Sequence, residues 1–128
     1  MAETGLTVHR ARQVGAWTVV AVTGEIDFTT ADTLYAHGHR LLADGSGHLI
    51  LDFAAVTFCD SSGMSALIGL MREARLRNGI LALAGAPGRV RRALHQIGLH
   101  RFIPVYPDVE AAVAAAMLPP QGGDQQAK

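Results

Sequence analysis

The sequence predicts a single α/β domain, with a small mixed but mostly parallel sheet, surrounding helices and an opening β-hairpin. Short apolar runs typical of buried strands alternate with longer segments whose apolar residues recur at helical spacing. The chain has 128 residues, which is the size of one domain. Strands joined through helices usually lie parallel, whereas two strands joined by a short turn lie antiparallel. These observations together favour an α/β sandwich.

Composition supports a folded globule and excludes several classes of protein. Hydrophobic residues make up 49% of the chain and charged residues 17%, which argues against intrinsic disorder. One cysteine excludes an internal disulfide. Eleven basic and eleven acidic residues balance, so general binding to nucleic acid or an anionic membrane is not expected. No signal peptide is recognisable and no apolar run approaches roughly 20 residues, so we expect a cytoplasmic protein.

The balanced charge conceals an asymmetry between the two halves of the chain. Residues 1–64 hold three basic against seven acidic side chains, and residues 65–128 hold eight against four. All the basic residues except Lys128 are arginines. Solvated helix faces would account for this distribution. Arginine clusters also suit a protein-binding surface, because a guanidinium pairs well with carboxylates.

The first half of the chain predicts a hairpin and a helix. Residues 6–12 alternate apolar and polar, and residues 16–23 are a second β-rich run, which Gly24 ends. A helix then begins with Thr29 as its hydroxyl cap and Asp32 three positions later, in the pattern of a capping box. Residues 44–47 end this helix.

The middle of the chain predicts a central strand and a second helix. Residues 48–53 are dense and apolar, as expected of a strand covered on both faces. After residues 54–59, a helix follows and runs to about Asn78, where Asn78-Gly79 suits a left-handed cap.

The second half continues the alternation. We expect a buried strand at 80–84, a helix from 87 to 97, a short strand at 102–105 and a helix at 108–118 capped by Asp108. The domain is thus expected to span residues 1–118. Residues 119–128 are rich in Gln, Gly and Pro and are expected to form a flexible tail.

The most informative segment joins a strand to a helix through Asp60, Ser61, Ser62 and Gly63. A helix N-terminus offers unpaired N–H groups and the positive end of the helix dipole, which favour an anion such as phosphate. The alternative is simple capping, because Asp and Ser are among the commonest N-cap residues. The segment alone does not decide between these interpretations.

A second polar segment, which includes Gly24, Glu25 and Asp27, also follows a strand. The carboxyl ends of parallel strands gather at one edge of a sheet, where ligands and partners usually bind. We therefore expect Asp27 and Asp60 to lie near Ser61 and to form an acidic recognition patch. No histidine is adjacent in sequence to act as a base for that serine.

Three motifs together resemble the STAS domain and, more narrowly, the bacterial anti-sigma factor antagonists. They are T-G-E-I-D, then L-I-L-D-F-A-A-V-T-F-C-D-S-S-G-M, then V-R-R-A-L-H-Q-I-G-L. The resemblance runs from about residue 8 to residue 116. It implies a small mixed sheet with helices, in agreement with the alternation of strands and helices described above.

The resemblance also implies a mechanism. In that family the first serine after the aspartate, here Ser61, is phosphorylated by an anti-sigma factor that is itself an ATP-using serine kinase. The unphosphorylated antagonist binds this kinase and releases a sigma factor, and a phosphatase would reset the phosphoserine. The chain itself would need no cofactor. The resemblance places the docking surface around the phosphorylation site, at Gly24, Glu25, Asp27, Asp60, Ser62, Gly63 and Met64.

Enzyme and metal-binding interpretations fit the sequence poorly. A serine hydrolase of the nucleophile-elbow type needs G-x-S-x-G, but Cys59 and Asp60 stand where its first glycine would be. His37 and His39 would lie about 200° apart on a helix, which makes a poor chelate. Cys59 has no partner thiol and, beside Phe58, is expected in the core, as are Trp17, Met64 and Met71.

Other roles of the STAS domain remain as the alternative. The same fold would suit a scaffold in a stress-signalling assembly, or an accessory subunit of a lipid or anion transport system. Such proteins need not keep a phosphorylatable serine. The presence of Asp60-Ser61 favours the antagonist.

Overall fold

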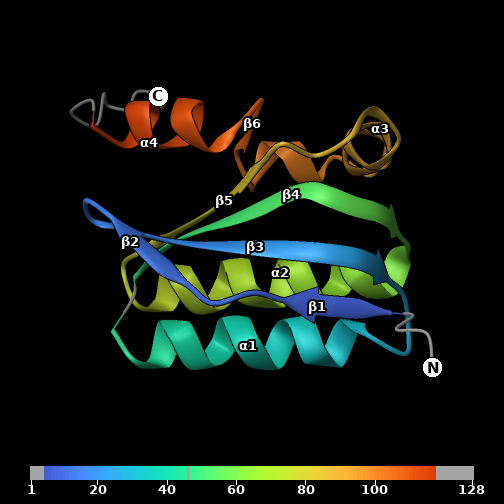
Figure 1. The fold of residues 1–128 in the computed structure, drawn as a ribbon, viewed down its shortest axis with the longest axis horizontal. Coiled ribbons are helices and arrows are strands. Elements are labelled where there is room, and N and C mark those ends of the chain that lie inside the picture. The colour runs from blue at the N-terminus through green and yellow to red at the C-terminus, as the bar shows by residue number, and fades with distance from the viewer. Residues whose placement is uncertain (1–4, 46, 118–128) are drawn as a thin grey trace.

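A six-stranded mixed sheet forms the centre of the protein in a computed structural model that describes residues 5–45 and 47–117 (Figure 1). The strands are β1 (Leu6–Val8), β2 (Arg12–Val14), β3 (Trp17–Ile26), β4 (His48–Cys59), β5 (Ile80–Ala84) and β6 (Val105–Tyr106). The helical elements are α1 (Ala31–Ala43), α2 (Ser61–Leu76), α3 (Gly88–Gln96), the 3₁₀ turn η1 (Leu99–Arg101) and α4 (Val109–Met117).

The order of the sheet confirms the predicted fold class. The strands follow the order β1-β3-β4-β5-β6, and β2 also pairs with β3. The neighbours from β3 to β6 are parallel, whereas β1 and β2 are both antiparallel to β3. No described helix is long and apolar enough to cross a membrane.

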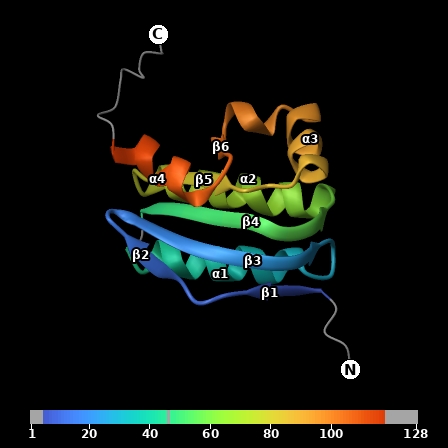
Figure 2. The same ribbon diagram turned by 45° about the horizontal axis from the view of Figure 1, so that its top comes forward.

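Helices cover both faces of the sheet, with α1 and α2 on one face and α4 on the other (Figure 2). On one face, Leu51 and Phe53 of β4 belong to a core shared with Leu34 of α1 and Leu67 of α2. On the other, Ile50 belongs to a smaller core with Ala112 of α4. Residues on both sides of β4 are therefore buried, which explains why its sequence is almost continuously apolar. Helix α3 lies beside β4, and buried residues of α3 and η1 join the larger core.

The opening strand of the hairpin is split in two. Val8 pairs with Val22 and Arg12 pairs with Val19, so three residues of the first strand stand opposite two of β3. One extra residue interrupts a ladder in this way. The single strand predicted over 6–12 is therefore wrong, although the hairpin itself is confirmed.

Two further strand predictions are corrected. Strand β3 does not end at Gly24 but continues to Ile26, because its pairing with β4 extends to the pair of Ile26 and Cys59. Gly24 has a φ of +115°, and a Cβ there would collide with the carbonyl oxygen of Gly5. The glycine thus permits close approach of β1. The last strand is Val105–Tyr106 and not 102–105, because residues 99–101 form η1.

The helix boundaries follow the sequence signals with one exception. Asn78 is left-handed, with a φ of 61°, and follows α2 as predicted. Asp108 accepts a hydrogen bond from the N–H of Ala111 at 2.7 Å. The capping box at the start of α1 is wrong, because the N-cap is Thr30 and no side chain caps it. The tail predicted over 119–128 and Leu118 lie outside the described residues.

Candidate functional site

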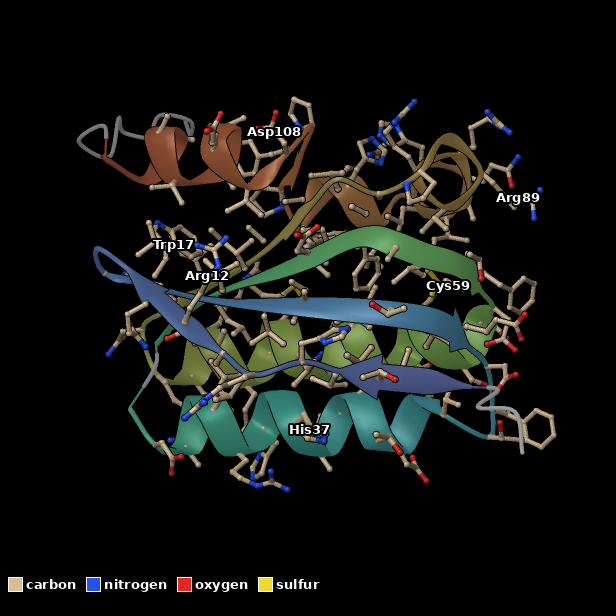
Figure 3. The ribbon with its side chains drawn as sticks, viewed as in Figure 1. Arg12, Trp17, His37, Cys59, Arg89 and Asp108 are labelled. Carbon is tan, nitrogen blue, oxygen red and sulfur yellow. The ribbon has the colours of Figure 1, made fainter. Side chains whose placement is uncertain are left out.

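The carboxyl ends of β3 and β4 lie side by side and bring the two polar segments together. Ile26 pairs with Cys59, and the N–H of Asp60 donates to the carbonyl of Ile26 at 3.1 Å. Cys59 marks this end of the sheet in Figure 3. The segments that follow, one through Asp27 and the other through Ser61, therefore leave the sheet at the same edge.

Asp60 caps helix α2 and leaves Ser61 exposed. One carboxylate oxygen of Asp60 accepts from the N–H of Ser62 at 2.8 Å and from that of Gly63 at 3.2 Å. Ser61 is the first residue of the helix, and its side chain faces solvent. The capping function falls to the aspartate, so the serine hydroxyl is not needed for it.

Replacing Asp60 with alanine should destabilise the protein by about 1 kcal/mol, because two N–H groups lose their acceptor. Asp60→Asn should cost much less, since asparagine caps about as well as aspartate. Urea denaturation of both variants measures the difference. Equal stability of the alanine variant and the wild type would contradict the capping role.

The loop after β3 is held by its own hydrogen bonds. A carboxylate oxygen of Asp27 accepts from the Thr29 N–H at 2.9 Å and from the Thr29 hydroxyl at 2.6 Å. The buried Thr30 hydroxyl donates to the carbonyl of Glu25 at 2.8 Å and accepts from the N–H of Asp27 at 2.9 Å. The sequence pattern assigned Thr29 to a capping box with Asp32, whereas in the structure Thr29 and Thr30 hold the loop between β3 and α1.

These bonds predict a pH effect with a definite sign. The hydrogen bonds from Thr29 are the main cause that lowers the pKa of Asp27 below its ordinary 3.8. A lowered pKa stabilises the folded loop above pH 3.8, and this stabilisation is lost as the pH falls through the lowered pKa. We expect an NMR titration of Asp27 to have its midpoint below 3.8, and Thr29→Val to raise that midpoint. A wild-type midpoint at or above 3.8 would be the contrary result.

The predicted surroundings of Ser61 divide into exposed and buried positions. Glu25 is exposed, and Asp27, Asp60 and Ser62 are partly exposed. Gly63 and Met64 are buried, so in this structure they support the surface from beneath and do not form it.

The sequence patterns did not predict the exposure of two aromatic residues at this edge. Phe28 is 79% exposed, and Phe58, a residue type usually buried, is 42% exposed. The pairing of β3 with β4 shifts register between Gly24 and Glu25, and the alternation of buried and exposed residues in β4 breaks down over 57–58. This edge of the sheet, called the rim below, thus exposes two aromatic rings beside its carboxylates. Aromatic side chains are enriched at protein interfaces.

Two other groups considered as functional candidates, Cys59 and His39, are held by contacts within the fold. Burial raises the pKa of the Cys59 thiol to about 12, so it is protonated at neutral pH. His39 lies 3.3 Å from a carboxylate oxygen of Glu73 and stacks on Tyr35. Within residues 5–45 and 47–117, no three histidine, cysteine or acidic side chains are grouped to hold a metal ion.

The family follows from the match of the whole domain. The family model of the STAS domain matches residues 8–112, so the chain belongs to the STAS domain family. Within that family it belongs with the anti-sigma factor antagonists. The crystal structure of an anti-sigma factor antagonist from Mycobacterium paratuberculosis is 31% identical, covers 86% of this chain and 92% of its own, and has a TM-score of 0.77.

Two further relatives extend the comparison. An anti-sigma F factor antagonist from Paenibacillus polymyxa is 26% identical over 89 residues, which are 69% of this chain and 76% of that protein. The Bacillus cell fate determinant SpoIIAA, solved in its phosphorylated form, is 22% identical. That match covers 86% of this chain and 99% of the other with a TM-score of 0.65, and it shows a likeness of fold alone.

Proposed function

We propose that this chain is a phosphorylation-controlled antagonist that acts in the cytoplasm. Unphosphorylated, it binds an anti-sigma factor and thereby frees a sigma factor. That anti-sigma factor is an ATP-using kinase, and its phosphorylation of Ser61 switches binding off until a phosphatase resets it. The observation that carries this proposal lies at the start of α2. Asp60 caps the helix there, and Ser61 is exposed to solvent and is not needed as a cap.

The chain supplies a binding surface in this scheme, and the chemistry belongs to the partner. Residues 24–27 and 58–64 contain no histidine that would activate Ser61 as a nucleophile. The sequence also has neither a P-loop nor a dinucleotide-binding fingerprint, so ATP is assigned to the kinase. The chain is therefore proposed to be a substrate and ligand of an enzyme, and not an enzyme itself.

The effect of the phosphate should fall on binding and not on folding. A phosphoserine adds about −1.5 to −2 charges at pH 7. At the first position of α2 the helix dipole stabilises that charge by about 0.3–1 kcal/mol, so the fold should survive. The partner, in contrast, would have to desolvate a dianion next to the carboxylates of Asp27 and Asp60. Each 1.4 kcal/mol lost in binding is a tenfold loss of affinity.

Paired affinity capture tests the proposal. Wild-type and Ser61→Asp chains serve as baits in a lysate of the native host supplied with ADP, and mass spectrometry identifies the bound proteins. We expect the wild type to retain an ATP-binding anti-sigma factor kinase that the aspartate variant loses. If both baits instead retain the same transporter or scaffold subunits, the chain is a STAS module of the alternative kind and Ser61 is not its switch.

A further inference from the structure

A groove lies between α2 and the segment that follows α3, away from the phosphorylation site. Its volume is about 390 Å³, and it is lined by Ile68, Met71, Arg72, Arg75, Ile97, Leu99 and Phe102. Two of its apolar walls are open to solvent, since Ile97 is 58% exposed and Phe102 53%. Exposed apolar side chains that cluster in this way are typical of a contact site.

The charges of the groove have one sign. Arg72 and Arg75 are its only charged lining residues. A guanidinium nitrogen of Arg75 donates to the carbonyl of Phe102 at 3.2 Å, which fixes that side chain across the groove. A positioned guanidinium loses less freedom when it binds a carboxylate. The groove therefore suits a ligand that carries both apolar and acidic side chains.

Helix geometry connects the groove to the phosphorylation site. At 100° per residue, positions 4, 7 and 11 residues after Ser61 all fall within about 40° of it on the helix. These positions are Ser65, Ile68 and Arg72, and of these Ser65 and Arg72 are exposed and Ile68 is partly exposed. One side of α2 thus runs without interruption from the serine hydroxyl into the groove.

A protein interface of ordinary size is large enough to cover both Ser61 and the groove. A standard interface buries about 800 Å² on each partner, and a round patch of that area has a radius of about 16 Å. Along α2, Ile68 lies about 10 Å from Ser61 and Arg72 about 16 Å. A partner centred on Ser61 and spread along this side of α2 would therefore extend over the groove.

We propose that the groove is the second part of the docking surface for the anti-sigma factor, and that it binds an acidic, apolar segment of that partner. The apolar side chains of the segment fill the space between Ile68 and Phe102, and its carboxylates pair with Arg72 and Arg75. This inference rests on the proposed function and adds a contact that phosphorylation of Ser61 does not touch.

The test uses the purified kinase captured by the wild-type chain as its probe. Arg72→Glu and Phe102→Asp should each weaken binding by about 10- to 100-fold, because one reverses the charge and the other removes an apolar wall. Arg72→Gln should weaken it less than Arg72→Glu. Arg12→Glu is the matched control and should leave affinity unchanged, since this exposed arginine of β2, labelled in Figure 3, lines a different hollow together with Val109 and Glu110 of α4. Circular dichroism confirms that each variant is folded.

The outcomes separate this inference from the proposed function. If Arg72→Glu and Phe102→Asp bind the kinase with wild-type affinity while Ser61→Asp still binds it weakly, the inference is overturned and the proposed function stands. Absence of any kinase bound to the wild type would overturn the function. The rim itself carries carboxylates and the exposed rings of Phe28 and Phe58, so it has the chemistry of the expected ligand. The rim of a second copy of this chain is therefore the competing occupant of the groove. A wild-type dimer that Arg72→Glu dissociates without loss of kinase affinity would also overturn the inference.

Discussion

Ser61→Asp is expected to lower the affinity for the anti-sigma factor at least ~100-fold, because binding would have to take an added, unpaired carboxylate out of water beside other carboxylates. The substituted carboxylate would stand beside Asp60, on the rim that also carries Glu25 and Asp27. Thermal stability should change little, since an acidic residue in the first turn of a helix is favourable. Isothermal titration with the purified partner measures the affinity, and calorimetric unfolding measures the stability.

The matched control is Ser61→Asn, which has nearly the same shape as the aspartate variant but no charge. We expect it to retain most of the wild-type affinity, and Ser61→Ala to bind constitutively because it cannot be phosphorylated. Equal losses in the asparagine and aspartate variants would assign the effect to shape and contradict the electrostatic switch.

Gly63→Ala is expected to destabilise the protein by about 2–3 kcal/mol, which is within the usual range for overpacking a core. A Cβ on Gly63 would lie 2.5 Å from the sulfur of Cys59 and 2.7 Å from the Cγ2 of Ile26. The first turn of α2 must then move away from the ends of β3 and β4, and Ser61 moves with it. Urea denaturation measures the loss of stability.

Gly69→Ala is the control, because it makes the same change six residues further along the same helix. The nearest atom there is the ring edge of the partly exposed Tyr35 at 3.0 Å, which has room to shift. Alanine gains up to ~1 kcal/mol in helix propensity, so the net change should stay below ~1 kcal/mol. Comparable destabilisation by both substitutions would refute the packing argument for Gly63.

The fold could be predicted from the sequence because its strands and helices differ in period. Strand β5 was predicted with the boundaries that the structure has, since its apolar run is bounded by turn residues on both sides. Strand β4 is longer than predicted, because residues 54–59 continue it beside β3. Boundaries that depend on pairing with a distant strand leave little local signal.

The candidate site, too, could be predicted only where it depends on local sequence signals. Asp27, Asp60 and Ser61 could be placed at one edge because the two segments that hold them each follow a strand. The exposure of Phe58 could not, since it depends on a register shift between β3 and β4 that the local pattern does not report. The loop bonds of Thr29 and Thr30 were obscured because a hydroxyl before a helix also resembles a cap.

Phosphorylation at Ser61 itself provides the most direct test of the proposed switch. The purified kinase and ATP would be used to modify the chain, mass spectrometry would locate the phosphate, and the modified and unmodified chains would be titrated against the same partner. We expect a single phosphate on Ser61, an unchanged circular dichroism spectrum and an affinity at least ~100-fold weaker. A phosphate on another residue, or a phosphorylated Ser61 that binds as tightly as before, would contradict the proposed switch.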